Sequence, residues 1–134
     1  MRALLLTAAL LVPVAAFAQD DFTGPRQGRG ISNETLGLIP LGQYIESHED
    51  RTMRMRYWEV EPGGVVPLHS HANRPSMIYI MEGTIVEHRS DLDEPKVYGP
   101  GGVSIEAGPV LHWWENTGDV TVKMIAFDVF QDQM

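Results

Sequence analysis

Two histidines separated by one residue are the strongest chemical signal in this 134-residue sequence. His69 and His71 flank Ser70 within a stretch of strand-forming residues. On a strand, residues i and i+2 project from the same face, so both imidazoles would point to one side. Two such imidazoles can take adjacent positions on a metal ion, although similar pairs also occur on ordinary protein surfaces. A metal site here needs a further ligand from elsewhere in the fold.

His112 is the best candidate for that further ligand. It follows a Gly-Pro turn and lies in the strand-like residues 111–115. The chain contains no cysteine, so any metal site must be built from histidines and carboxylates. Imidazoles bind Fe, Zn, Mn, Ni and Cu to different degrees, so we expect a divalent transition metal without specifying which.

The glycines and histidines around these positions form two spaced motifs that resemble those of the cupin superfamily, specifically the small single-domain cupins. The first motif contains Gly63, His69, His71 and Gly83, and the second contains Gly101, His112 and Asn116. The resemblance covers residues 36–130. It implies a double-stranded β-helix, which is a small jelly-roll barrel, with a metal held inside by the three histidines. It also implies a homodimer.

The first motif departs from the cupin pattern at Ser76, which stands where the family has a glutamate. Serine is a poor metal ligand, so the resemblance implies a neutral set of three histidines with coordination positions open to water or substrate. Glu106 or Glu115 could replace the carboxylate, but the spacing of neither supports this. Glu87 and His88 could supply a general base, although His88 matches no motif and is expected at the surface.

Three residues are candidates for contact with a small-molecule ligand. Arg74 follows the histidine pair and could hold a substrate carboxylate, with a solvated turn cation as the alternative. Trp114 shares the strand face of His112 and could line a cavity. Ser76, which stands at the position of the family glutamate, is the third candidate for contact with the ligand.

The first 18 residues have the pattern of a secretory signal peptide. Arg2 precedes an apolar run that ends in Ala16-Phe17-Ala18, which is typical of a cleavage site. A membrane anchor is the alternative, but the apolar run is shorter than the roughly 20 residues that span a bilayer. We therefore expect a periplasmic or secreted protein that has no membrane association after cleavage.

The remaining sequence predicts an all-β protein. Residues 19–35 are polar and glycine-rich, which indicates a flexible lead-in, and residues 36–134 form the expected cupin barrel domain. Short runs of β-branched and aromatic residues alternate with Gly, Pro, Asn and Asp. The predicted strands are residues 38–45, 52–60, 65–71, 76–81, 84–89, 96–98, 103–105, 111–115 and 120–130.

Charge and motif together leave two main functions open. The formal net charge of -8 argues against a nucleic-acid partner, because phosphates would be repelled. One hypothesis is a metal-dependent enzyme acting on a small organic substrate, with dioxygenase-like chemistry as the leading case. The alternative is a non-catalytic module that binds a small molecule or the metal. A structural protein with a vestigial site is a weaker third hypothesis.

Overall fold

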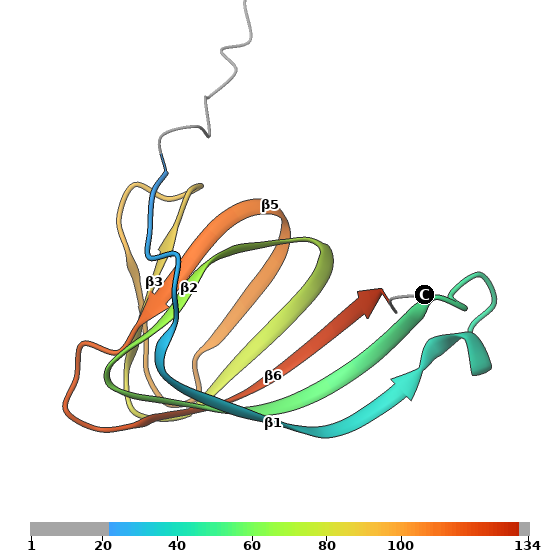
Figure 1. Ribbon diagram of the computed structural model, residues 1–134, viewed down its shortest axis with the longest axis horizontal. Coiled ribbons are helices and arrows are strands. Elements are labelled where there is room, and N and C mark those ends of the chain that lie inside the picture. Colours follow the sequence, from blue (N-terminus) through green and yellow to red (C-terminus); the bar gives the residue numbers. More distant parts are fainter. Residues whose placement is uncertain (1–21, 132–134) are drawn as a thin grey trace, which may run out of the picture.

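Strands make up most of residues 22–131, the part of the chain that the computed structural model describes (Figure 1). The strands are β1 (Arg29–Pro40), β2 (Arg51–Glu82), β3 (Ile85–Arg89), β4 (Lys96–Tyr98), β5 (Val103–Glu115) and β6 (Val122–Gln131). A short 3-10 helix, η2 (Leu41–Gln43), follows β1. Within the described residues, no helix is long and apolar enough to cross a membrane.

The long strand β2 organises the barrel. All strand pairs are antiparallel, and the sheet has the order β1-β2-β5-β3-β4. β6 pairs with two segments of β2, residues 51–60 and residues 76–82. Asp128 therefore lies opposite Arg54 on one side and opposite Ser76 on the other. β2 and β5 therefore curve around the interior (Figure 1), and the predicted all-β jelly-roll barrel is confirmed.

Several predicted turns are bends inside continuous strands. The sequence predicted separate strands on either side of Pro62-Gly63-Gly64 and of the turn after His71, but both lie within β2. Gly63 has a φ of 73°, a left-handed conformation that favours glycine. The pairing of β2 with β5 shifts register between Ser70 and His71, next to the histidine pair. Such bulges change the direction of side chains without ending a strand. The turn-forming residues at these positions therefore led to a prediction of too many strands.

The predicted lead-in is wrong for its last part. β1 begins at Arg29, and residues 31–35 pair with residues 56–60 of β2. The polar composition concealed an edge strand, because both faces of β1 are largely exposed and need few apolar residues. The predicted signal peptide, residues 1–18, lies outside the described residues.

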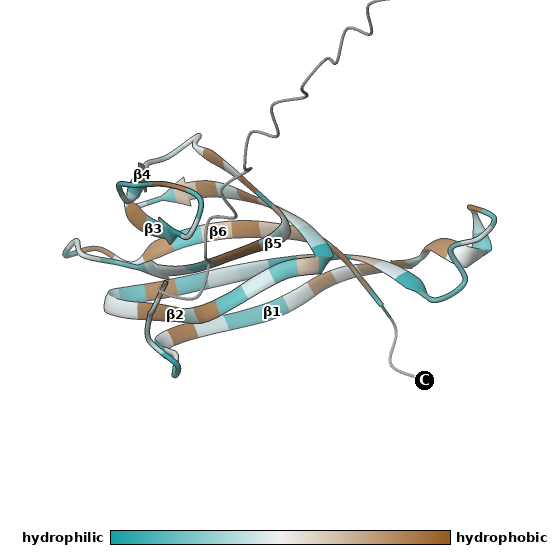
Figure 2. Cartoon of the chain, turned by 90° about the horizontal axis from the view of Figure 1, so that it is seen from above, coloured by the Kyte–Doolittle hydropathy of each residue, from teal (hydrophilic) through white to brown (hydrophobic). Residues whose placement is uncertain are grey.

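The core follows from the two-residue period of the strands (Figure 2). On β6, Val122, Met124 and Ala126 are buried, and Asp128 comes next on the same inward face. They pack with buried residues of the other strands, namely Val60, Ile78, Ile80, Ile85, Tyr98 and Trp114. The inward face thus changes from apolar to charged along β6, and the polar end is where the candidate site lies.

Candidate metal centre

The structure brings together the three histidines that the sequence singled out. His69 and His71 lie on β2, and His112 lies opposite His69 on β5. Their ring centroids are 4.4 to 5.1 Å apart, and one nitrogen from each ring lies within 4.8 Å of the others. Adjacent antiparallel strands therefore supply a three-imidazole cluster at the inner wall of the barrel.

Each imidazole is held in place by a hydrogen bond between its Nδ1 atom and an oxygen atom of another residue. The partners are the carbonyl oxygen of Pro67 for His69 at 2.7 Å, that of Arg74 for His71 at 2.7 Å, and Oε1 of Glu87 for His112 at 2.8 Å. A carbonyl or carboxylate oxygen accepts a hydrogen bond, so Nδ1 must donate it. In the neutral ring the proton is then on Nδ1, and Nε2 carries a free lone pair.

These lone pairs fit a bound metal cation. The Nε2 atoms of His69 and His71 are 3.0 Å apart, and Nε2 of His112 is buried without a hydrogen-bond partner among the described residues. Burial lowers the pKa of His69 and of His71 to about 4, so both rings are neutral near pH 7. Converging lone pairs repel one another unless a cation lies between them, and neutral imidazole is a common ligand of transition metals.

Glu87 is a supporting residue that the sequence did not place correctly. It is fully buried and also accepts hydrogen bonds from Tyr98 at 2.9 Å and Ser104 at 3.1 Å. Burial raises its pKa, but the hydrogen bonds from His112 and Tyr98 outweigh this effect and lower the pKa overall. An ionised Glu87 fixes the orientation of His112 and makes its Nε2 more basic. The signal available in the sequence was the spacing of Glu87 two residues after Ile85, which places both on one face of a strand, and the structure shows that this face is buried.

Glu106 brings a carboxylate to the cluster from a different strand than the family pattern implies. It lies on β5 opposite Ser76, the position where the motif has its glutamate. Its Oε2 is 3.2 Å from Nε2 of His71, and its Oε1 accepts a hydrogen bond from Trp114 at 3.1 Å. Burial raises the pKa of Glu106 to about 7. Spacing along the chain could not indicate Glu106, because its position depends on the pairing of β2 with β5.

The other carboxylate and histidine considered from the sequence lie away from the cluster. Glu115 accepts a hydrogen bond from Nε2 of His88 at 2.9 Å. The His88 ring stacks on Trp113, with 3.8 Å between the ring centroids. His88 therefore points away from Glu87, and the two adjacent residues do not form a catalytic pair.

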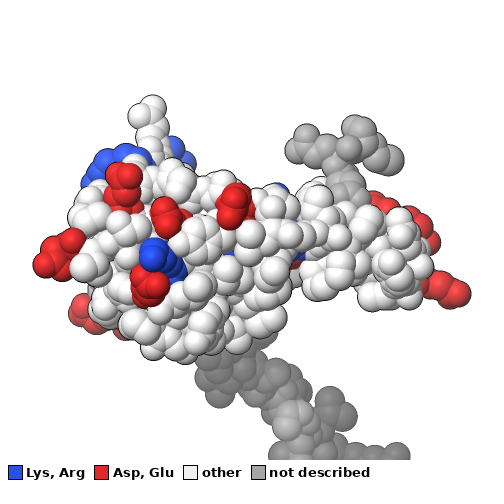
Figure 3. Space-filling view, turned by 90° about the horizontal axis from the view of Figure 1, so that it is seen from below, with Lys and Arg blue, Asp and Glu red and all other residues white. Residues whose placement is uncertain are grey.

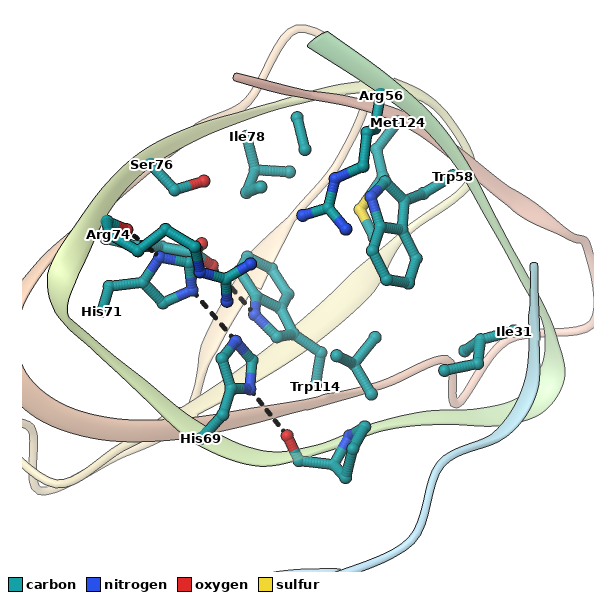
Figure 4. Close-up of a pocket in the computed structure, with 14 residues that line it drawn as sticks. Ile31, Arg56, Trp58, His69, His71, Arg74, Ser76, Ile78, Trp114 and Met124 are labelled. Atoms are coloured by element: carbon teal, nitrogen blue, oxygen red, sulfur yellow. Dashed lines mark hydrogen bonds and ion pairs between the residues drawn. The ribbon is translucent and has the colours of Figure 1, made fainter. Parts of the chain in front are cut away.

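A cavity of about 290 Å³ opens beside the histidines (Figure 4). The three predicted ligand-contact residues, Arg74, Ser76 and Trp114, all line it. Its walls are largely apolar, and two lining residues that the sequence did not single out are Arg56 and Trp58. Imidazole nitrogens of His69 and His71, two guanidinium groups and an apolar wall thus face one space, which is suited to a small organic molecule.

Comparisons with known proteins agree with this architecture. Residues 56–130 match the family model described as Cupin domain. Germin-like protein 5-1 from Oryza sativa subsp. japonica is 26% identical over 119 residues, which cover 84% of this chain and 54% of that protein. The chain therefore spans about half the length of this curated relative.

Two solved structures have a similar fold. A predicted oxalate decarboxylase from Thermotoga maritima has a TM-score of 0.61 and 21% identity, covering 84% of this chain and 96% of that chain. The polyketide cyclase RemF from Streptomyces resistomycificus has a TM-score of 0.61 and 18% identity, covering 88% and 84%. At these low identities, the two likenesses show a shared fold alone. Because the family match covers more than half of the sequence, this chain belongs to the cupin domain family.

Proposed function

We propose that this protein is an exported, metal-dependent cupin enzyme that acts on a small organic molecule. His69, His71 and His112 would hold a divalent transition metal, such as Fe, Zn, Mn, Ni or Cu. The observation that carries this proposal is the cluster of one nitrogen from each ring within 4.8 Å of the others, with Nε2 of His112 buried and without a hydrogen-bond partner among residues 22–131. Held by neutral imidazoles, the ion would keep its positive charge and supply Lewis-acid or dioxygenase-like chemistry.

The protein's own residues prepare the site for this chemistry. Glu87 and two main-chain carbonyls fix the imidazoles before a metal binds, which reduces the entropy lost on binding. Glu106 lies close enough to His71 to act as a fourth ligand. Arg74, Ser76 and Trp114 line the cavity in which the substrate would be oriented.

A non-catalytic binding module is the second candidate. It is favoured by the hydrogen bonds that already engage both carboxylates near the histidines. Glu87 accepts bonds from Tyr98, Ser104 and His112, and Glu106 accepts one from Trp114. Glu87 is therefore not a free general base among the described residues, and Glu106 would serve as the fourth metal ligand rather than as a base.

Metal analysis of the full-length protein, purified from the exported fraction, tests the metal site. We expect about one transition-metal ion per chain, and its loss in the double variant with His69→Ala and His112→Ala. His88→Ala is the matched control and should keep the metal, because His88 lies outside the cluster. Unchanged metal content in the double variant would show that the site is assigned to the wrong residues.

Oxygen uptake separates the enzyme from the binding module. Iron-loaded protein should consume oxygen with at least one member of a panel of catechols, diketones and thiols. Absence of uptake across the panel, with iron still bound, would favour the binding module. Recovery of the protein only from the cytoplasm would contradict the proposed export.

A further inference from the structure

Three arginines surround one buried aspartate at the wall of the cavity. Asp128 accepts hydrogen bonds from Arg54 at 2.7 and 3.0 Å, from Arg74 at 3.2 Å and from Arg56 at 3.4 Å. The Asp128 side chain is fully buried, and all three arginine side chains are at least two-thirds buried. The cluster carries three positive charges and one negative charge, in a protein whose formal net charge is -8.

The three arginines differ in how they contact Asp128. Arg54 contacts both carboxylate oxygens through Nε and Nη2, a bidentate pairing that satisfies it. Arg56 and Arg74 each contribute one longer contact to the same oxygen, Oδ2. Nε of Arg56 is also buried without a hydrogen-bond partner among residues 22–131. A guanidinium has five N–H donors, so Arg56 and Arg74 retain donors that Asp128 does not use.

The two arginines with spare donors are those that face the cavity. Arg56 and Arg74 line it, whereas Arg54 does not. Figure 4 shows both guanidinium groups pointing into the space beside His69 and His71. The Arg56 guanidinium also lies over the Trp58 ring, 4.8 Å from its centroid, which fixes its position.

This arrangement selects for a negatively charged ligand with an apolar part. Glu106 also lines the cavity, but three arginines still exceed the two carboxylates of Asp128 and Glu106. Buried charge without a counterion is unfavourable, so this remaining positive charge favours an anion. Two planar guanidinium forks match the planar, bidentate geometry of a carboxylate. The cavity is small, near the low end of the roughly 300–1,000 Å³ typical of ligand sites, and Trp58, Trp114 and Met124 give it an apolar wall.

We infer that the ligand of this cavity is a small organic carboxylate. Its carboxylate oxygens accept hydrogen bonds from Arg56 and Arg74, and its apolar body lies against Trp58 and Trp114. This inference names the substrate class of the proposed enzyme. It rests on the proposed function only for the reaction that would follow at the metal. Binding itself needs only the two arginines and the apolar wall.

Isothermal titration calorimetry with matched acid and amide pairs tests the inference. The probes are benzoate, cinnamate and hexanoate, each compared with its primary amide, and inorganic phosphate. At least one carboxylate should bind metal-loaded wild-type protein about tenfold or more tightly than its amide, the amount expected for charge-assisted hydrogen bonds. Arg56→Gln and Arg74→Gln should each weaken that carboxylate by about 10- to 100-fold.

Two further variants control for charge and folding. Arg51→Gln removes a cation from the same strand, outside the cavity, and should leave carboxylate affinity unchanged. Arg56→Lys keeps the charge but not the fork, and should bind more weakly than wild type and more tightly than Arg56→Gln. Circular dichroism and melting temperature identify any variant that fails to fold.

The failure of this inference and that of the proposed function are distinguishable. If every carboxylate binds no better than its amide, or phosphate binds more tightly than all of them, the carboxylate assignment is wrong. Metal content measured on the same samples reports separately on the histidine site. Carboxylate binding by a protein that never holds metal would leave this inference standing and overturn the proposed enzyme.

Discussion

At the scale of single residues, the candidate site depends on which nitrogen of each histidine is free. Three acceptors fix the Nδ1 protons of His69, His71 and His112, and so leave the Nε2 lone pairs free in a cluster that offers one nitrogen from each ring within 4.8 Å of the others. Two of these acceptors are main-chain carbonyls, which mutation cannot easily remove. The third is the Glu87 carboxylate, so Glu87 offers the direct experimental test of this arrangement.

Glu87→Gln should weaken metal binding without unfolding the protein. The amide oxygen can still accept the hydrogen bond from His112, but the negative charge that raises the basicity of Nε2 is lost. We expect metal affinity to fall by about 10- to 100-fold, as is typical for loss of such a supporting group. Competition with a chelator of known affinity measures this change.

The control for Glu87→Gln is Glu115→Gln. Glu115 also accepts a hydrogen bond from a histidine, His88, but that pair lies outside the cluster. Metal affinity should be unchanged in the control. Equal affinities in wild type and Glu87→Gln would show that Glu87 does not support the metal site.

At the scale of strands, one carboxylate ties together two distant parts of β2. Asp128 is on β6, Arg54 and Arg56 come from the first part of β2, and Arg74 comes from the part beyond the bend. Burial raises the pKa of Asp128, but the hydrogen bond from Arg54 and the charges of the arginines lower it overall. The ion-pair cluster thus contributes to closing the barrel as well as to its charge.

Asp128→Asn should destabilise the protein in a pH-dependent way. Removing one partner of a buried ion pair costs about 3–5 kcal/mol of unfolding free energy. Since the folded pKa is below the unfolded value, the wild-type advantage should be complete above about pH 4. It should diminish as the pH falls through the lowered pKa of the folded state. Urea unfolding of both proteins at several pH values measures the difference.

Asp119→Asn is the control for this measurement, because Asp119 is exposed in the loop before β6. It should change stability by less than about 0.5 kcal/mol at every pH. A constant difference between wild type and Asp128→Asn down to strongly acidic pH would contradict a titrating Asp128 as the source of the stabilisation.

At the scale of the whole molecule, the barrel has an exposed apolar face that crosses three strands. Met77 and Tyr79 on β2 pair with Ile105 and Val103 on β5, and Met77 also pairs with Phe127 on β6. All five are exposed, with Ile105 at 66%. In the view from below in Figure 3, the charged side chains leave a broad area without Lys, Arg, Asp or Glu on that side of the molecule. The strand pairings alone make the five exposed apolar residues neighbours, and a contiguous apolar face is typical of an interaction surface.

We expect this face to form the homodimer that the cupin resemblance implied. The wild-type protein should have twice the chain mass by size-exclusion chromatography with light scattering. Ile105→Glu should convert it to the single-chain mass, because a charge buried in an interface costs several kcal/mol. Val97→Glu is the control: Val97 is 61% exposed on β4, outside this face, and should leave the mass unchanged. A wild-type protein of single-chain mass would contradict the homodimer.

Much of the fold could be predicted from local sequence. Alternating apolar residues and the two glycine–histidine motifs led to the all-β barrel, since both depend on short-range periodicity and turn chemistry. The same approach treated residues 29–35 as a flexible segment and divided β2 and β5 into several strands. In each case a glycine- or proline-containing stretch was accommodated by a bulge or an exposed edge.

The sequence by itself determined which residue types were available for the site. With no cysteine, and with His69, His71 and His112 in motif positions, an imidazole cluster was the expected metal site. Only the tertiary structure decided what surrounds it. Glu106 reaches His71 through the pairing of β2 with β5, and Arg56 meets Arg74 through Asp128 on β6. These contacts join residues far apart in the chain, and strand register, which local periodicity does not specify, sets them.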